Sequence, residues 1–445
     1  MTFLEKIFRF PGGIHADGHK EDAASVPLKK LPMPKQIAIS MSQHIGASSV
    51  PCVKPGDRVK RYQKIGDAAG AVSSAVHTPL AGVVKAISVS STASTRVAPA
   101  VVIDVDPEDE SRDETLVPID WSNAAPGEIV ARVRDAGIVG AGGAGFPTAV
   151  KLTPPKGKSI DTVIINGAEC EPYLNGDNRL MIERSSDVWT GGEIIRRAVG
   201  AKRLVVAIEE NKPKAIAAMS AAGPADGEIA VLPHSYPQGS EKHVIYSVTG
   251  RTVMTGHLPA DTGCLVENVW TTISICRAVT QGIPSVVRTL TIAGDAIARP
   301  SNFAAPIGAR VMDIIEAAGG FTATPAKAIC GGPMMGVAMP DIDVPITKTC
   351  SGLLFFTAKS VFGYESNPCI GCGRCVKVCP MGLMPAEIAK AVEANDIDLA
   401  AKFHVMNCFE CGCCSYVCPA HRPLVQHNRR AKAIIGAKLR AAKGK

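Results

Sequence analysis

The 445-residue sequence lacks two features that would place it in a membrane or direct it across one. No stretch approaches 18 consecutive apolar residues, so we expect no membrane-spanning helix. The first residues, MTFLEKIFRFPGG, place charged residues among apolar ones and contain no apolar core before a small-residue cleavage site. We therefore expect no signal peptide.

Acidic residues are missing from the C-terminal end. Residues 421–445 contain eight Lys or Arg and no Asp or Glu. The net charge of the whole chain is +7, so the other 420 residues carry a net charge of −1. A basic tail can bind anionic lipid, an acidic partner or nucleic acid, and a solvated end explains it equally well.

The composition is otherwise that of a globular protein. Hydrophobic residues make up 46% and charged residues 20%, and the length suggests about three domains. Cysteine is the exception, because eight of the 15 cysteines crowd into two short windows. Such crowding indicates metal ligation in a reducing compartment rather than a disulfide framework.

The two cysteine windows share the spacing C-x2-C-x2-C-x3-C-P. Thiolates at this spacing are typical ligands of [4Fe–4S] clusters, and the fourth cysteine of each run ligates the other cluster in two-cluster ferredoxins. A pair of zinc knuckles is the alternative, although zinc sites usually pair two ligands with two more after a gap. Cys413 is off-pattern and is interpreted as a bystander. The predicted ligand sets are Cys369, Cys372, Cys375 and Cys418 for one cluster, and Cys408, Cys411, Cys414 and Cys379 for the other.

The remaining sequence predicts a multidomain α/β protein. Short alternating runs before residue 120 predict a β domain that resembles the lipoyl-type barrel-sandwich fold, but its hairpin tip, AGAVSSAVHTPLAG, has no lysine to carry a cofactor. Strand and helix patterns alternate over 125–285 and predict an α/β domain. Residues 286–326 resemble a soluble-ligand-binding β-grasp domain. The predicted division is 1–120 barrel-sandwich, 121–285 α/β, 286–355 β-grasp, 356–425 ferredoxin-like helical domain and 426–445 basic tail.

A glycine-rich segment, GIVGAGGAGFPTAVK at 137–151, suits close approach to a phosphate. It lacks both the G-K-[ST] of a Walker A loop and the G-x-G-x-x-G that follows a strand, so alone it is only moderately specific. A predicted strand, 161–167, is followed by Glu169 and Glu171. Ligands of α/β folds bind at such strand ends.

Together these motifs carry a family resemblance. GAGGAGFPTAVK and INGAECEPYLNGD resemble segments of the flavin- and NADH-binding subunit of respiratory complex I. They resemble more closely still the C subunit of the Rnf complex, an ion-translocating ferredoxin:NAD+ oxidoreductase. FPGGIH, YPQGSEKHVIYSVTGR, LPADTGCLVENVWT, GGPMMG and both cysteine windows extend the second resemblance over nearly the whole chain.

The resemblance implies FMN, NAD(H) and two [4Fe–4S] clusters as cofactors. The cofactor-binding residues it implies are Gly140, Gly142, Gly143, Gly145 and Lys151 at the flavin phosphate, Asn166 and Glu169 on the isoalloxazine side, Glu171 in the same motif, Phe146 for stacking, and Glu241, Asn268 and Thr271. Tyr173 stands where complex I has glycine, and Ser240 replaces the first acid of the complex I GEET motif. These departures concern the dinucleotide contacts.

The resemblance also implies a role: a peripheral oxidoreductase subunit on the cytoplasmic face of the inner membrane. It would pass electrons between NAD(H), FMN and the clusters, with other subunits of the complex as partners, ferredoxin or flavodoxin as an indirect partner, and no nucleic acid. Since a flavin exchanges both electron pairs and single electrons, it would stand between nucleotide and clusters. The alternatives are the flavin subunit of a hydrogenase or formate dehydrogenase, and a flavin-free electron relay with a vestigial loop.

Overall fold

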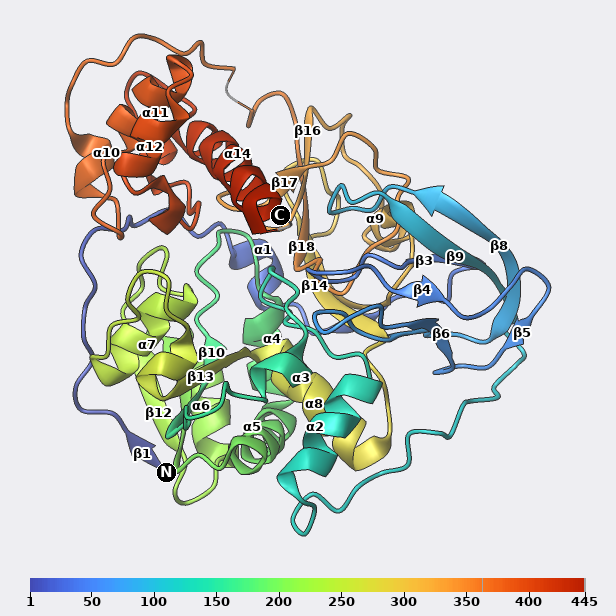
Figure 1. The fold of residues 1–445 in the computed structure, drawn as a ribbon. Coiled ribbons are helices and arrows are strands. Elements are labelled where there is room, and N and C mark those ends of the chain that lie inside the picture. The colour runs from blue at the N-terminus through green and yellow to red at the C-terminus, as the bar shows by residue number, and fades with distance from the viewer. Residues whose placement is uncertain (362, 444–445) are drawn as a thin grey trace.

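The computed structural model of the chain describes residues 1–361 and 363–443 and divides them among four packed parts. Figure 1 shows a β-barrel part at the right, an α/β part at the lower left, a β-grasp part above the centre and a group of cysteine-bearing helices at the upper left. Residue 362 of the predicted ferredoxin-like domain, and Gly444 and Lys445 of the predicted tail, lie outside the described residues.

A five-stranded, wholly parallel sheet organises the α/β part. Its order is β1-β12-β11-β10-β13. The inner strands are runs of β-branched residues with both faces buried, as parallel sheets require. The bounds are β1 Thr2–Phe3, β10 Thr162–Gly167, β11 Arg203–Glu209, β12 Glu228–Leu232 and β13 Cys264–Asn268.

Helices cover both faces of this sheet. A core cluster beneath α2, α5 and α8 fills one face, and α7 packs on the other. The sequence pattern at 181–200 predicts one helix, but the structure breaks it at Arg184 into α4 and α5. The bounds are α2 Pro126–Asp135, α3 Thr148–Lys151, α4 Gly176–Glu183, α5 Ser185–Val199, α6 Pro213–Ala222, α7 Glu241–Thr249 and α8 Val269–Gln281, with a 3-10 turn at Pro259–Thr262.

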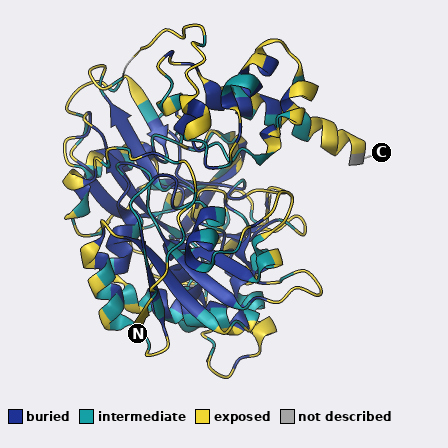
Figure 2. Cartoon of the chain, turned by 90° about the vertical axis from the view of Figure 1, so that its left-hand side faces the viewer, coloured by how far each residue is buried: buried dark blue, intermediate teal, exposed yellow. Residues whose placement is uncertain are grey.

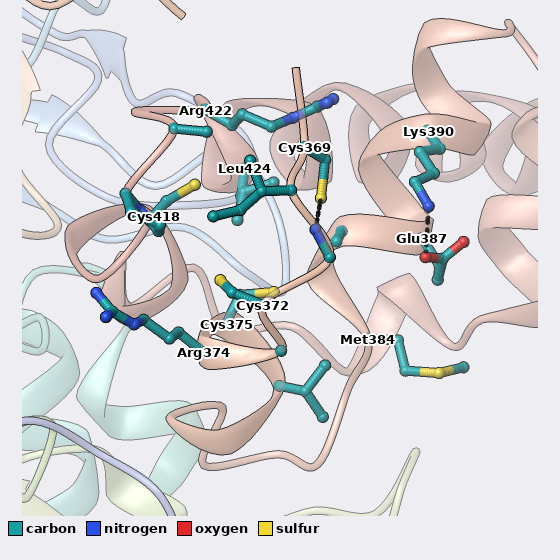
Figure 3. Close-up of a pocket in the computed structure, with 17 residues that line it drawn as sticks. Cys369, Cys372, Arg374, Cys375, Met384, Glu387, Lys390, Cys418, Arg422 and Leu424 are labelled. Atoms are coloured by element: carbon teal, nitrogen blue, oxygen red, sulfur yellow. Dashed lines mark hydrogen bonds and ion pairs between the residues drawn. The ribbon is translucent and has the colours of Figure 1, made fainter. Parts of the chain in front are cut away.

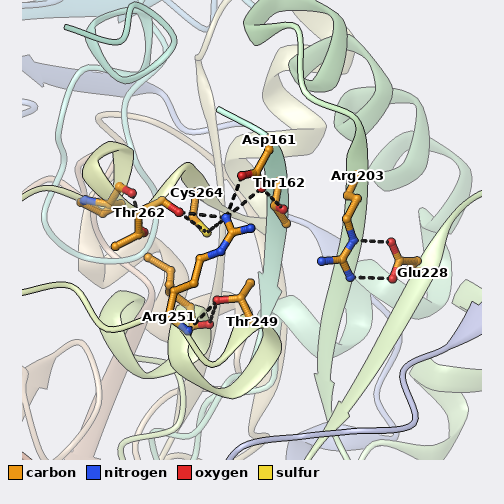
Figure 4. A network of polar contacts seen from close by, with 10 residues as sticks. Asp161, Thr162, Arg203, Glu228, Thr249, Arg251, Thr262 and Cys264 are labelled. Carbon is orange, nitrogen blue, oxygen red and sulfur yellow. Dashed lines mark hydrogen bonds and ion pairs between the residues drawn. The ribbon is translucent and has the colours of Figure 1, made fainter. Parts of the chain in front are cut away.

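Ion pairs close the amino edge of the sheet (Figure 4). Arg251 Nη1 donates to both carboxylate oxygens of Asp161, at 2.8 and 2.9 Å, and to the carbonyl of Thr262. Arg203 at the start of β11 makes a two-pronged pair with Glu228 of β12, at 2.9 and 2.7 Å. These pairs link the starts of neighbouring strands, whereas ligands of α/β folds bind at the opposite, carboxyl edge.

The barrel part joins two small antiparallel sheets around one core. Their orders are β3-β9-β8-β5 and β4-β6-β7. Inward-facing side chains such as Ile37, Ile65 and Ile103 are fully buried between them. The bounds are β3 Gln36–Ser40, β4 Val50–Pro51, β5 Arg58–Val59, β6 Lys64–Asp67, β7 Val76–His77, β8 Gly82–Ser90 and β9 Ala98–Val105.

The β-grasp part is a mixed sheet with one helix packed on it. The order is β17-β16-β18-β14-β15-β2, and α9 contributes Val311, Ile314 and Ile315 to the core. The bounds are β2 Lys29–Lys30, β14 Val287–Ala293, β15 Ser301–Pro306, α9 Val311–Ala317, β16 Lys327–Cys330, β17 Val337–Ala338 and β18 Gly352–Phe356.

Short helices carry the cysteine windows, and one long helix closes the chain. The last helix, α14, spans the predicted boundary at residue 425 and packs against α11 and α12, so the beginning of the predicted tail belongs to the cysteine-bearing part. Its far end projects into solvent (Figure 2). The bounds are α10 Arg374–Lys377, α11 Pro385–Glu393, α12 Ile397–Lys402, α13 Cys413–Tyr416 and α14 Leu424–Lys443, with a 3-10 turn at Val405–Asn407.

The first 30 residues do not join the barrel, although the sequence predicts a single β domain over 1–120. β1 pairs with β12 of the α/β sheet, and β2 pairs with β15 of the β-grasp sheet. A short helix, α1 (Glu21–Ala24), lies between them. Among the helices of residues 1–361 and 363–443, none is long and apolar enough to cross a membrane.

Candidate functional site

The glycine-rich segment forms a closed loop at the carboxyl edge of the parallel sheet. Val139 and Pro147 pair as an isolated antiparallel bridge, and the Gly140 N–H donates to the carbonyl of Phe146 at 2.8 Å. Gly143 and Gly145 have φ of +108° and +66°, a backbone region that L side chains enter only with strain. The half-buried side chain of Phe146 follows directly.

The tip of this loop presents free backbone donors. Gly142, Gly143 and Ala144 are exposed, and within residues 1–361 and 363–443 their N–H groups have no hydrogen-bond partner. No atom lies within 4 Å of the position that a β-carbon would take at Gly143. Successive free N–H groups around an open space suit an anion such as phosphate, so the loop fits the phosphate end of a flavin nucleotide.

Two buried side chains hold the base of the loop. The Thr271 hydroxyl accepts the Ala141 N–H at 2.9 Å, and Arg288 Nη2 donates to the Ala141 carbonyl at 2.9 Å. Burial lowers the pKa of the Arg288 guanidinium. Thr271, predicted as a cofactor ligand, therefore uses its hydroxyl to bind the loop backbone. It influences ligand binding through the conformation of the loop.

Polar side chains continue the site along the sheet edge. Asn268, at the end of β13, accepts the Trp270 N–H at 2.9 Å and donates to Asp177 at 2.7 Å. The Glu169 carboxylate accepts the N–H groups of Asp177 and Asn178 at 3.0 and 3.1 Å, and so covers the first turn of α4. Burial, followed by the charge of Glu169, raises the pKa of Asp177 to about 7. Asp177 can therefore hold a proton near neutral pH.

Asn166 is the last residue but one of the neighbouring strand β10. Its Nδ2 donates to the carbonyl of Gly239 at 2.9 Å, and its Oδ1 accepts the Ala168 N–H at 3.1 Å. One contact lies in the loop that follows β10, and the other lies in the loop that precedes α7. The side chain therefore fixes the spacing of these two loops at the carboxyl edge.

Lys151 and Glu241 form a separate ion pair on the α7 side. Lys151 Nζ lies 3.0 Å from Glu241 and 3.6 Å from the fully buried Glu267, and it also donates to the Val266 carbonyl. Burial acts to lower the pKa of Lys151, but the charges of Glu267 and Glu241 outweigh it and raise that pKa above its usual value. Lys151 thus stays cationic and engaged within this pair.

Glu171 reaches toward the β-grasp part. Its carboxylate accepts the N–H groups of Met334 and Met335 at 3.1 and 2.8 Å. A β-carbon at Gly332 would lie 2.2 Å from Glu171, so the GGPMMG segment needs glycine here. Burial raises the pKa of Glu171 to about 7, although the two N–H groups oppose this rise. Glu171 therefore joins the candidate flavin site to the segment that leads to the cysteine windows.

The second cysteine window lies against this junction. The buried Tyr236 donates its hydroxyl proton to the carbonyl of Cys411 at 2.7 Å. Gly412 packs against the Met334 carbonyl, with 3.0 Å to the position of a β-carbon. Cys413 is fully buried beside Tyr236. Burial, followed by the nearby thiols of Cys408, Cys411 and Cys379, raises the pKa of Cys414 to about 12.

The first window lines a cavity at the surface. Cys369, Cys372, Cys375 and Cys418 share a cavity of about 190 Å³ (Figure 3). The loop that carries Cys372 is exposed, and its neighbour Ile370 is 70% exposed. Four thiols around one hollow fit a cubane cluster and match the predicted crossed set. In the described residues 1–361 and 363–443, no three cysteine, histidine or carboxylate side chains are placed to hold a single metal ion.

Four residues of this arrangement were not predicted from the sequence. No residue spacing in the sequence marks Tyr236, Asp177 or Arg288 as functional, although they lie in motifs or strands. Lys20 comes from the N-terminal segment and reaches the loop after β10. The sequence indications were that Asp177 and Tyr236 lie in segments of the family resemblance, INGAECEPYLNGD and YPQGSEKHVIYSVTGR, and that Lys20 follows a third segment, FPGGIH, by five residues.

Comparison with known proteins agrees with the four parts. Family models match as the RnfC barrel sandwich hybrid domain over 8–108, the Nuo51 FMN-binding domain over 133–277, the SLBB domain over 289–338 and the 4Fe-4S dicluster domain over 368–421. The C subunit of the ion-translocating oxidoreductase complex of Rhodobacter capsulatus is 44% identical over 433 residues, which cover 96% of this chain and 83% of that protein.

The chain belongs to the family of C subunits of ion-translocating oxidoreductase complexes.

Two further members of this family support the assignment. The C subunit of the Na(+)-translocating ferredoxin:NAD(+) oxidoreductase complex of Acetobacterium woodii is 42% identical, covering 97% of this chain and 98% of its own. The proton-translocating counterpart of Clostridium ljungdahlii is 42% identical, covering 85% and 83%. A crystal structure of an NAD+-reducing [NiFe]-hydrogenase in the H2-reduced state shares the fold, with a TM-score of 0.50 and 20% identity over 72% of this chain and 64% of that one.

Membership of this family confirms the predicted resemblance and fold class. The FMN-binding and dicluster family models confirm the flavin and iron–sulfur domain types, and the dicluster match decides against zinc knuckles. The individual ligand residues stay predictions, which the geometry above makes specific.

Proposed function

We propose that this chain is the NAD(H)- and FMN-binding electron-transfer subunit of a membrane-associated, ion-translocating complex that links NAD(H) to ferredoxin. The names of its relatives, which are subunits of ferredoxin:NAD(+) oxidoreductase complexes, support this role. We place the protein peripherally on the cytoplasmic face of the inner membrane, with other subunits of the complex as its partners.

One observation carries the proposal: the hydrogen bond from Tyr236 to the carbonyl of Cys411. It joins the loop before α7, at the carboxyl edge of the parallel sheet, to the second cysteine window. Glu171 and the 332–335 segment make a parallel connection. Such contacts bring the carboxyl edge of the sheet and the second cysteine window close together, as electron transfer from a flavin to a cluster requires.

Each part of the site then has a role. A bound flavin exchanges electron pairs with a nicotinamide and single electrons with iron–sulfur clusters. The free N–H groups at 142–144, within the loop Gly140–Gly145, bind its phosphate. Asn166, Glu169 and Asn268 shape the wall beside its ring, and Phe146 is placed to stack. Lys151, expected at the flavin phosphate, is instead held by Glu241 and Glu267, so the phosphate is left to the backbone N–H groups of the loop.

The two cysteine sets take different places in the path. The set Cys408, Cys411, Cys414 and Cys379 lies against the flavin side, and Cys411 and Cys414 are buried. The set Cys369, Cys372, Cys375 and Cys418 lines the surface cavity of Figure 3. We therefore assign the set with Cys408 to an inner cluster. The set with Cys369 is assigned to an outer cluster, which faces another protein of the complex.

The proposal is tested on anaerobically purified protein. We expect bound FMN, two clusters and bleaching of the flavin band on addition of NADH. Iron without flavin, and no response to NADH, would instead establish the electron-relay alternative.

A matched pair of variants tests the phosphate loop. Gly142 does not have a positive φ, and its β-carbon position has room, with Asn268 3.8 Å away. Gly142→Ala should keep FMN. Gly142→Asp places a carboxylate at the free N–H groups and should weaken FMN binding at least tenfold, about 1.4 kcal/mol. Equal FMN affinities in the two variants, measured by fluorescence titration, would remove the loop from the site.

A further inference from the structure

The N-terminal segment 14–20 crosses the carboxyl edge of the parallel sheet and ends in a buried lysine. Lys20 is 8% exposed. Its Nζ donates to the carbonyls of Glu169, Glu171 and Leu174 at 2.8, 2.8 and 2.5 Å. An ammonium has three protons to donate, so one side chain satisfies three carbonyls of a single loop and uses its full capacity in doing so.

Neighbouring groups reinforce this attachment. The Tyr173 N–H donates to the Gly18 carbonyl at 2.7 Å, and Asn175 Nδ2 donates to the Lys20 carbonyl at 3.1 Å. His19 stacks on the Tyr173 ring, with centroids 4.9 Å apart and planes 12° apart. Loop 169–175 is therefore tied to segment 18–20 along its whole length.

The tied loop carries two acids that face in different directions. The Glu169 carboxylate holds the N–H groups at the start of α4, and the Glu171 carboxylate holds those of Met334 and Met335 in the β-grasp part. Lys20 bonds the backbone of both acids, not their carboxylates. It can therefore set the position of both acids while leaving their oxygens for other partners.

We propose that Lys20 is a positioning residue that holds loop 169–175 so that Glu169 stays beside the flavin site and Glu171 stays on the segment leading to the inner cluster. The redox part of this inference rests on the proposed function. The positioning itself concerns only residues of this chain and is measurable in protein without flavin.

The fixed charge of Lys20 adds a second consequence. Its ammonium lies within electrostatic range of Glu171, Asp177 and Glu209, and it lowers the pKa of each of these carboxyls against the larger effect of burial. A buried positive charge favours electron uptake by a nearby acceptor, since the added negative charge is stabilised where water is excluded. Removing the charge should make a bound flavin harder to reduce.

Amide hydrogen exchange in Lys20→Met tests the positioning. The methionine keeps the apolar stem and loses all three donors. We expect exchange at the Asp177, Asn178, Met334 and Met335 amides to quicken at least tenfold, although the last two belong to the β-grasp part. Lys348→Met is the matched control, because Lys348 is also buried and donates to two carbonyls, those of Ala75 and Gly137. It should leave those four amides unchanged.

Lys20→Arg separates charge from geometry and serves if the methionine variant does not fold. A planar guanidinium cannot aim three donors of one nitrogen at three carbonyls, so exchange should still quicken while the charge remains. With FMN bound, Lys20→Met should lower the equilibrium constant for flavin reduction by NADH about tenfold, about 30 mV for a two-electron couple. Lys20→Arg should keep it.

Wild-type exchange at all four amides in both Lys20 variants, or the same increase in Lys348→Met, would overturn the positioning role. An unchanged flavin potential in Lys20→Met would overturn the charge effect. Wild-type protein that binds no FMN, yet shows the exchange pattern in its Lys20 variants, would refute the proposed function and leave the positioning role standing.

Discussion

Replacing Glu209 should change how the stability of the α/β part depends on pH. Glu209 ends β11 and is fully buried, and in the described part of the chain neither carboxylate oxygen has a hydrogen-bond partner. The charged groups that face it are Lys20, Lys212, Glu169 and Glu210. Burial raises the pKa of Glu209 from 4.5 to about 7, even though the two lysines act in the opposite direction.

The sign and size of the effect follow from this pKa. Between pH 4.5 and 7 the folded chain keeps a proton that the unfolded chain has released, so the free energy of unfolding falls as the pH rises. One pH unit corresponds to about 1.4 kcal/mol, so ionised Glu209 costs the fold about 3 kcal/mol above pH 7. Glu209→Gln is neutral at every pH, and any cost of burying its amide is constant.

Amide exchange of β11 measures this locally. Relative to wild type, Glu209→Gln should gain about a hundredfold in protection between pH 5 and pH 7.5, which is about 3 kcal/mol. Glu210→Gln, at the exposed neighbouring position, is the control and should show no such gain. Wild type and Glu209→Gln with parallel pH profiles would refute the reasoning, because Glu209 would then ionise without cost.

Two further predictions concern the cysteine windows. If ligation is crossed, Cys418→Ala and Cys372→Ala should each lower the iron content from about eight to about four atoms per chain. Both variants should leave the same residual electron paramagnetic resonance spectrum, whereas Cys414→Ala should leave a different one. Matching spectra for Cys418→Ala and Cys414→Ala would show that each window holds its own cluster. Tyr236→Phe removes the donor to the Cys411 carbonyl, a hydrogen bond that contributes about 1 kcal/mol. Amide exchange at residues 408–416 should therefore quicken about fivefold. The same exchange rates in Tyr236→Phe and in a Tyr246→Phe control would show that this hydrogen bond does not stabilise the contact.

Local patterns made much of the architecture predictable. The strand at 161–167 was evident because a buried parallel strand is a continuous run of β-branched residues. The cysteine spacing predicted which four thiols share a cavity, since that spacing follows from wrapping one chain around a cubane. The glycine loop was also predictable from the sequence, because its backbone conformation needs residues without a β-carbon.

Contacts between distant segments could not be predicted in this way. Nothing in the two residues of β1 indicates that they pair with β12, more than 200 residues later. Arg184 interrupts a stretch whose helical pattern continues on both sides. Lys20 resembles any solvated lysine in sequence, and only the folded chain places three carbonyls around it. Such positions are set by tertiary packing, which leaves no local period.

The threading of the first 30 residues has a consequence for synthesis on the ribosome. Their contacts lie with β12, with β15 and with the carbonyl of Val378, which accepts the Gly13 N–H at 2.9 Å. At the usual elongation rates Val378 is added about 20 to 75 seconds after Gly13. The segment emerges first but can settle last, after the cysteine windows have been made. The hydrogen bond between Gly13 and Val378 therefore cannot form until most of the first cysteine window has been synthesised.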